Sequence, residues 1–180
     1  MTRLKEKYIK EIIPEMEKEF GYKNKMAVPR VTKVVINMGL GKFLRDGSKD
    51  DFKKITKDFT DIVGQKPVIT KAKKAIAGFK IREGMPVGLM VTIRGARMYE
   101  FLDRLISVAL PQIRDFRGLS KKAFDKNGNF NIGIREHIIF SEVNKDDIRH
   151  ILGMEISVVT TAKTDEEAYK FLKGLGFPIA

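Results

Sequence analysis

The segment from Lys66 to Arg82 contains many basic side chains and no acidic one. A solvated surface usually intersperses both signs of charge, so a segment of one sign indicates a polyanionic ligand. Small residues between the cations let the backbone approach a phosphate chain closely. The basic residues are Lys66, Lys71, Lys73, Lys74, Lys80 and Arg82, and the small ones are Ala72, Ala75, Ala77 and Gly78. We therefore predict that this segment binds nucleic-acid phosphates, the alternative being a loop that only keeps the protein soluble.

Phe79 is the one aromatic residue of this segment. A ring among cations can stack on a nucleic-acid base, because every base presents a π face. It can equally anchor the loop on the protein, and the sequence favours neither interpretation. The residue type alone therefore does not decide the role of Phe79.

No pattern of catalytic or metal-binding residues stands out in the sequence. Gly39-Leu40-Gly41 follows a predicted strand, but Leu44 occupies the third glycine position of a dinucleotide-binding loop. His137 and His150 have no third ligand at metal spacing, and the chain has no cysteine. We therefore predict a protein that is not an enzyme and that uses neither a metal nor a cofactor.

Three segments alternate between apolar and polar residues, as strands that are buried on one face do. They cover residues 31–38, 87–94 and 129–135. Several of their polar positions hold side chains that can donate hydrogen bonds to phosphates, 2′-hydroxyls and base edges. These are Lys33, Asn37, Thr92, Arg94, Asn131 and Arg135. The pattern predicts a sheet with one polar, basic face, which is either an RNA-binding surface or simply the solvated side of the sheet.

Helical periodicity marks the segments that should cover the other face of this sheet. Residues 4–20 carry an apolar stripe interrupted by Pro14, which predicts two short helices. Ser48 is placed to cap a helix that Gly64 stops, and Thr164 is placed to cap the last helix. The connections are of the hairpin type and no linker divides the chain, so we predict a single α+β domain over residues 1–180. We expect a mainly antiparallel sheet of about five strands, with helices on one face and a polar, basic face opposite.

The charge balance is strongly basic, with 35 Lys and Arg against 23 Asp and Glu and a net charge of +12. Residues 141–180 are mildly acidic, so the positive excess lies in the first 140 residues. The longest uncharged run, residues 84–93, is too short to cross a bilayer. We expect a soluble cytoplasmic protein that binds RNA and no membrane.

Several short motifs follow one another along the chain. They are Val34–Gly41, Gly64–Pro67, Thr70–Lys74, Gly84–Pro86, Arg114–Gly118, Asp165–Ala168 and Leu175–Pro178. In this order they resemble the bacterial large-subunit ribosomal protein that binds 5S rRNA, the large-subunit protein five family, over essentially the whole chain. The hairpin Asp125–Phe130 departs from the family's usual Asp-Gly-Arg-Gly-Asn-Tyr, because its cation stands one position earlier and its last ring lacks a hydroxyl.

This resemblance implies an α+β structural protein that attaches 5S rRNA to the large rRNA in the central protuberance. The implied partners are 5S rRNA, large-subunit rRNA, P-site tRNA, a small-subunit head protein across an inter-subunit bridge, and neighbouring large-subunit proteins. By motif and by strand face, the 5S rRNA contacts are Lys33, Asn37, Met38, Gly39, Gln65, Thr92 and Arg94. The loop facing the tRNA carries Lys71, Lys73, Lys74, Phe79, Lys80 and Arg82. Two other interpretations stay open, namely a free-standing RNA-binding module or assembly chaperone and, more remotely, an enzyme acting on RNA.

Overall fold

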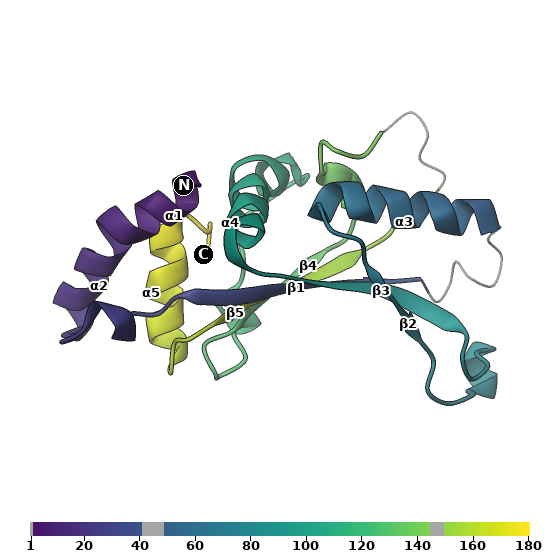
Figure 1. Cartoon of the computed structure of the whole chain (residues 1–180), viewed down its shortest axis with the longest axis horizontal. Coiled ribbons are helices and arrows are strands. Elements are labelled where there is room, and N and C mark those ends of the chain that lie inside the picture. Colours follow the sequence, from purple (N-terminus) through teal and green to yellow (C-terminus); the bar gives the residue numbers. More distant parts are fainter. Residues whose placement is uncertain (1, 41–48, 145–149) are drawn as a thin grey trace. The chain divides into compact units, whose positions relative to one another are not determined.

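The computed structural model describes residues 2–40, 49–144 and 150–180, and in these residues five strands form one sheet (Figure 1). The order across the sheet is β2-β3-β1-β5-β4, and the sheet is antiparallel. The strands are β1 (Val31–Gly39), β2 (Val68–Lys71), β3 (Pro86–Ile93), β4 (Phe130–Ile134) and β5 (Met154–Thr160). The predicted α+β class is confirmed. Gly41, Leu44 and Ser48, which entered the sequence analysis, lie outside the described residues.

By its internal contacts the chain divides into two units. Unit 1 comprises residues 1–35, 93–132 and 156–180, and unit 2 comprises residues 36–92 and 133–155. The division passes through β1, β3, β4 and β5, so each of these strands contributes residues to both units. That residues 1–180 behave as one domain therefore stays a prediction.

The first helical stretch of unit 1 contains two short α-helices, as predicted, but a π-helical turn joins them without a break in the helical backbone. Helix α1 (Arg3–Lys7) passes through a π-helical turn (Tyr8–Ile12) into α2 (Ile13–Phe20), and Pro14 lies in the first turn of α2. A proline lacks the N–H of the helical ladder and crowds the turn before it. The wider π-helical turn ahead of Pro14 accommodates both effects, so the backbone stays helical.

Helix α4 (Gly95–Arg104) ends in the same way. A π-helical turn (Leu105–Ala109) follows it and leads into a 3-10 turn (Leu110–Gln112) that contains Pro111. Each proline therefore follows a π-helical turn, but the helical backbone continues from Pro14 to Phe20, whereas it ends at Gln112, one residue after Pro111.

Helix α5 (Asp165–Leu175) begins at the predicted cap, where the Thr164 hydroxyl accepts a hydrogen bond from the Glu167 amide at 3.3 Å. Its buried side packs on the first helical stretch, where the rings of Tyr8 and Phe171 meet edge to face at 5.9 Å. Aromatic pairs favour this geometry because the positive edge of one ring faces the negative face of the other. The contact fixes the last helix of the chain on the first.

The hairpin before β4 is closed by Asp125, whose carboxylate accepts hydrogen bonds from the amides of Asn127 (2.9 Å) and Asn129 (3.0 Å). Burial raises the pKa of Asp125, but hydrogen bonds from Asn129 and Asn127 outweigh it and hold the pKa below its usual value. Gly128 has a φ of 76°, and a Cβ atom there would lie 2.7 Å from the Ala162 carbonyl oxygen. The predicted turn is therefore confirmed, and its glycine is a packing requirement.

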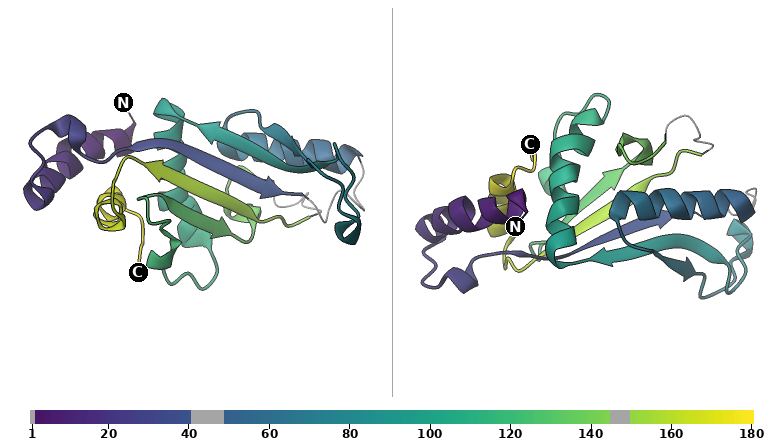
Figure 2. Two further views of the ribbon diagram at one scale, coloured as in Figure 1. Left: turned by 90° about the horizontal axis from the view of Figure 1, so that it is seen from below. Right: turned by 45° about the horizontal axis from the view of Figure 1, so that its top comes forward.

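Helix α3 (Lys49–Val63) covers the strands of unit 2 on one side. Its residues Phe59 and Ile62 are buried, as are Leu89 and Val91 of β3. Figures 1 and 2 show α3 along one side of β3, while the connection between β2 and β3 extends beyond the ends of these strands. The core of unit 2 therefore lies between α3 and one face of its strands, as the alternation predicts.

Strand β3 passes its neighbours very closely at Gly88. A Cβ atom built on Gly88 would lie 2.8 Å from the Met38 carbonyl oxygen and 3.0 Å from the Thr70 hydroxyl. The carbonyl belongs to the backbone of β1 and cannot move aside without shifting the strand. Any side chain at Gly88 would therefore force β1 and β3 apart.

His137 closes the loop that follows β4. Its side chain is buried, its Nδ1 accepts a hydrogen bond from the Leu152 amide at 3.2 Å, and its own amide donates to the Leu152 carbonyl at 2.9 Å. Burial lowers the pKa of His137 and outweighs the nearby negative charge of Asp58. The neutral ring is the form that can accept at Nδ1, so His137 has a structural role in closing this loop.

We predict opposite effects for two strand glycines. Gly88→Ala should lower the free energy of unfolding by about 1–3 kcal/mol, because the new methyl group overpacks against the β1 backbone. Gly133→Ala should leave it unchanged or raise it by up to about 1 kcal/mol, since a Cβ atom at Gly133 meets nothing within 4 Å and glycine weakens a strand. Urea unfolding of both variants measures this difference, and equal effects would contradict the close approach at Gly88.

We also predict that stability falls as the pH is lowered through about 6.5, the unfolded pKa of histidine. The folded pKa of His137 is lowered, so the unfolded chain takes up the proton first and acid favours unfolding. His137→Gln should be less stable at neutral pH but should lose this part of the pH dependence. His150→Gln, at an exposed position, is the matched control and should keep it. A parent curve that is flat between pH 7 and 5 would refute the role of His137.

Candidate nucleic-acid interface

The polar face predicted for β1 is present. Along the strand Ile36 and Met38 are fully buried, whereas Lys33 and Asn37 are half-buried on the opposite side. In β3 Val91 is buried and Thr92 half-buried, which continues the alternation. The side chains of Lys33, Asn37 and Thr92 therefore lie on the face away from the core.

Met38 is one of the predicted RNA contacts, and a contact at this position stays a prediction. Its side chain is only 2% exposed and belongs to the core of unit 2, because position 38 has the same parity as Ile36. An RNA could meet only the backbone here. Gly39, the last residue of β1, is exposed and offers backbone without a side chain.

Gln65 reaches β3 from the end of α3. The helix stops at Gly64, whose φ is 74° and whose amide donates to the Thr60 carbonyl at 2.7 Å. The next side chain, Gln65, then donates from Nε2 to the Thr92 carbonyl at 3.4 Å. The structure thus brings Gln65 and Thr92 together within unit 2, although they are 27 residues apart in the sequence.

Arg94 stands at the start of α4, in unit 1, and is exposed. It is the N-cap residue of the helix but forms no side-chain cap, and no acidic residue lies in the first turn. The N-terminal amides and the helix dipole therefore present positive charge without an internal counter-charge. Arg97, also exposed, adds a second guanidinium in this turn. Sequence reasoning missed Arg97, and the missing Ser, Thr, Asp or Asn at the cap was the available signal.

The predicted contacts are distributed over both units. Lys33 and Arg94 belong to unit 1, and the others belong to unit 2. The others are Asn37, Met38, Gly39, Gln65 and Thr92. Of the two further polar-face residues, Asn131 is half-buried and Arg135 exposed. The Met38 side chain is buried, and Gly39 has no side chain. The other positions named here have side chains that are exposed or half-buried and can face a ligand.

Most of the acid-free segment, residues 66–82, belongs to a β-hairpin that extends β2 and β3 and that also carries Glu83. The Ala72 amide donates to the Met85 carbonyl at 2.8 Å, and further out Ile76 and Ile81 exchange hydrogen bonds of 2.9 and 3.2 Å. Strands β2 and β3 pair antiparallel below these contacts, with Ile69 opposite Leu89. The predicted loop is therefore an ordered arm, which we call the basic hairpin (residues 71–85).

The tip of the basic hairpin exposes apolar side chains beside its cations. A 3-10 turn (Ala77–Phe79) is followed by Lys80 at a φ of 53°, a backbone conformation unusual for a residue other than glycine. Phe79 is 67% exposed and Ile76 48%. Phe79 therefore does not anchor the arm on the described part of the chain, and its ring is available to a ligand.

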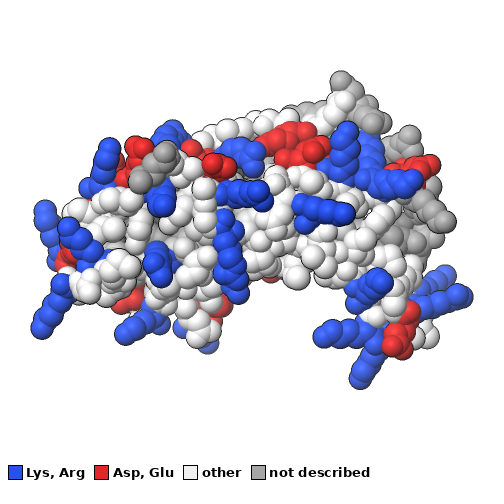
Figure 3. Space-filling model, viewed as in Figure 1, with Lys and Arg blue, Asp and Glu red and all other residues white. Residues whose placement is uncertain are grey.

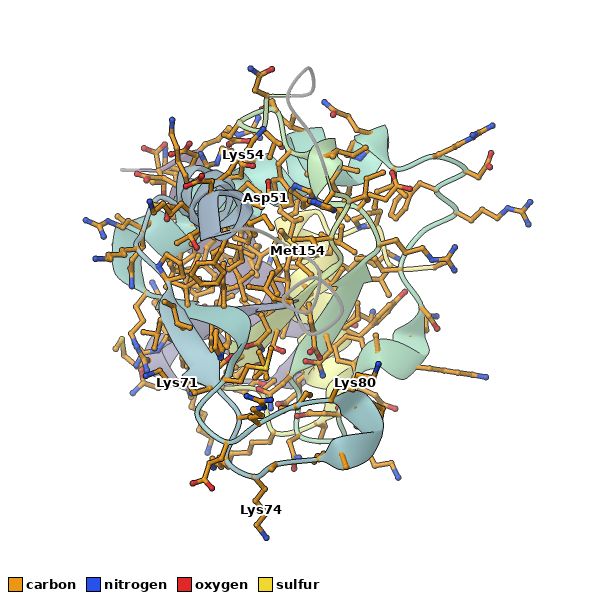
Figure 4. The ribbon with its side chains drawn as sticks, turned by 90° about the vertical axis from the view of Figure 1, so that its right-hand side faces the viewer. Asp51, Lys54, Lys71, Lys74, Lys80 and Met154 are labelled. Atoms are coloured by element: carbon orange, nitrogen blue, oxygen red, sulfur yellow. The ribbon has the colours of Figure 1, made fainter. Side chains whose placement is uncertain are left out.

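The cations of the basic hairpin point outward in different directions. Figure 3 shows Lys and Arg side chains gathered on this projecting arm, and in Figure 4 Lys74 points away from the rest of the protein with Lys71 and Lys80 on either side of the arm. These three lysines are exposed, as are Lys73 and Arg82, which complete the predicted set. Such a spread suits an extended phosphate backbone better than a single small anion.

The candidate interface is an exposed surface and not a cavity. Two hollows on unit 1, of about 550 and 490 Å³, are lined by none of the predicted contact residues. In the described residues no three His, Cys, Asp or Glu side chains are grouped to hold a metal. Over the same part of the chain, no helix combines the length and the apolar character that a membrane span requires.

Known proteins resemble the chain over nearly its full length. One family model, described as Ribosomal protein L5, matches residues 24–82, and another, described as the C-terminus of the same ribosomal protein family, matches residues 86–179. Large ribosomal subunit protein uL5 of Ralstonia pickettii (strain 12J) is 56% identical over 177 residues, which is 98% of this chain and 97% of that protein. The protein of the same name from Halothermothrix orenii (strain H 168) is 55% identical over 178 residues, which is 99% and 98% of the two chains.

Proposed function

The chain belongs to the ribosomal protein L5 family, and from this premise we propose that it binds 5S rRNA directly through the polar side of β1 and β3. As a member of this family it is a structural constituent of the large ribosomal subunit and not an enzyme. The predicted family, non-enzymatic character and ribosomal location are confirmed. The alternatives of a free-standing module and of an enzyme acting on RNA are thereby removed.

The pairing of Gln65 with Thr92 is the observation that carries the 5S rRNA proposal. It holds the Gln65 carboxamide 3.4 Å from the backbone carbonyl oxygen of Thr92 in β3, and Asn37 supplies a second carboxamide from β1 of the same unit. Carboxamides both donate and accept hydrogen bonds, which suits base edges and 2′-hydroxyls. The guanidinium of Arg94 can bond two phosphate or base acceptors at once. These groups can read a structured RNA, whereas lysines alone would only hold its backbone.

We assign the basic hairpin a second RNA, the P-site tRNA. Its lysines act as point charges on flexible stems, which suits phosphates shared by every tRNA. The exposed Phe79 ring adds a stacking surface that accepts any base. A tRNA that must be released needs contacts of this sequence-independent kind.

The remaining proposed contacts follow from family membership and from no single residue. The protein would attach 5S rRNA to the large-subunit rRNA in the central protuberance. It would also contact neighbouring large-subunit proteins and bridge to a small-subunit head protein. The net charge of +12 supports the rRNA contact, because a ribosomal surface of this sign must be matched by phosphates.

Binding of 5S rRNA by the isolated protein should weaken steeply with salt. We expect a slope of log affinity against log salt of roughly −3 to −5, corresponding to about 4–6 phosphate contacts. Filter binding or fluorescence anisotropy over a salt series measures the slope, with an unrelated structured RNA of the same length as the control. A flat salt dependence, or equal affinity for the unrelated RNA, would exclude specific 5S rRNA binding.

Asn37→Ala and Arg94→Ala should each weaken 5S rRNA binding by about 1–3 kcal/mol without loss of stability, because both side chains lie outside the core. Val91→Ala should do the reverse, since Val91 is buried and its loss leaves a cavity. Melting temperatures and affinities of the three variants separate the two effects. If the polar variants melt as low as Val91→Ala and bind normally, the binding face is assigned wrongly.

Replacing Lys71, Lys73, Lys74 and Lys80 together with Ala should leave folding and 5S rRNA binding nearly unchanged, because exposed substitutions usually change stability by less than about 0.5 kcal/mol. Large subunits that contain this variant should release P-site tRNA faster than parent subunits. A matched control removes the same charge elsewhere, at the exposed residues Lys5, Lys18, Lys57 and Lys163. Unchanged tRNA release would refute the tRNA contact, and loss of 5S rRNA binding would show that hairpin and sheet serve one RNA.

A further inference from the structure

A second acid-free stretch, residues 20–45, includes a turn that the functions above do not use. The turn, residues 23–30, joins α2 to β1 in unit 1 (Figure 2), and we call it the Met26 turn. Its cations Lys23, Lys25 and Arg30 are all exposed, and within the described residues none of them forms an ion pair. Positive charge is therefore gathered here without an internal partner.

The conformation of the turn is fixed locally by Asn24. The Asn24 side chain accepts a hydrogen bond from the Met26 amide at 2.8 Å, and the Asn24 carbonyl accepts one from Ala27 at 2.9 Å. Together they form a capped 3-10 turn (Lys25–Ala27). An asparagine cap of this kind satisfies amides that would otherwise need water, so the turn keeps its shape in solvent.

The turn is also fastened to the body of unit 1. Val28 is 1% exposed and Pro29 is buried, so the chain enters the core directly after the exposed residues. Arg30 donates its amide to the Thr161 hydroxyl at 3.0 Å and accepts the Thr161 amide at its carbonyl at 3.0 Å. The ordering of the backbone is thus provided by the fold before any partner binds.

Met26 is 75% exposed, the largest exposed fraction among the exposed large apolar side chains of the described residues. A single exposed apolar residue is ordinary. This one is held on a capped turn directly after Lys25 and two residues from the Asn24 cap. Its thioether side chain is unbranched and polarisable, which lets it pack on flat or irregular apolar surfaces.

We propose that the Met26 turn is a further RNA contact of this ribosomal protein, in which Met26 packs on an unstacked base and Lys23 and Lys25 hold the flanking phosphates. The proposal rests on the proposed RNA-binding function and adds a site to it. RNA loops and bulges offer splayed bases next to phosphates, which matches one exposed apolar group beside cations. A protein partner would need a wider apolar core than the single Met26 side chain, since its sequence neighbours in the turn are polar or small.

The test uses large subunits reconstituted with protein that carries a photo-reactive side chain, Met26→p-benzoylphenylalanine. Irradiation should cross-link this residue to RNA, and sequencing the adduct decides between 5S rRNA and large-subunit rRNA. The matched control is Ile9→p-benzoylphenylalanine, at a 44% exposed apolar position on the first helical stretch, which should give no comparable RNA adduct. Adducts to protein only, or none, would overturn the proposal.

A binding measurement on the full-length protein is a second, independent test. Met26→Ala combined with Lys23→Ala and Lys25→Ala should weaken binding to the RNA that the cross-link identifies by ~10-fold. The slope of log affinity against log salt should become less steep by about 2. Ile9→Ala should change neither. The melting temperature of each variant shows that the fold is kept. If parent protein itself fails to bind 5S rRNA or to enter subunits, the proposed function fails. If parent binds and the triple variant matches it, only the Met26 contact is refuted.

Discussion

The close approach of β1, β2 and β3 at Gly88 is the constraint on which the rest of unit 2 depends. With the Met38 carbonyl and the Thr70 hydroxyl already at contact distance from an imagined Cβ, no other residue fits without separating the strands. The same approach sets the register of the β2–β3 pair and therefore the direction in which the basic hairpin leaves the sheet. It also holds the end of β1, at Met38 and Gly39, against β3. One missing side chain thus supports both surfaces to which RNA is assigned.

The proposed contacts share an excess of positive charge. The basic hairpin, the first turn of α4 and the Met26 turn each present cations on backbone that is hydrogen-bonded within the protein. Ordering this backbone during folding lowers the entropic cost of binding later. The cost is electrostatic repulsion among like charges, which phosphates relieve in the complex. Acidic side chains concentrate elsewhere, as in the first turn of α5, where they complement the helix dipole.

The two prolines within helical stretches show how packing can override the rule that proline interrupts a helix. Pro14 predicts an interruption, yet the π-helical turn ahead of it keeps the backbone helical as far as Phe20, whereas the helical backbone at Pro111 ends one residue later, at Gln112. The packing of side chains in these turns favours the π-helical conformation. Tyr8, in the first π-helical turn, meets Phe171 of α5, and Leu105, in the second, is fully buried. Burial of these side chains offsets the less regular hydrogen bonding of the turn.

The sequence by itself determined the features that depend on local periodicity and on composition. The alternation along β1 and β3, the end of α3 at Gly64 and the cap at Thr164 follow from residues within a few positions of one another, and the acid-free segments follow from residue type alone. Only the tertiary structure decided which groups meet across long separations. It brought Gln65 to Thr92, placed the Met38 side chain in the core, and left the Phe79 ring in solvent. These outcomes depend on strand register and on the space left by distant residues, and a one-dimensional pattern contains neither quantity.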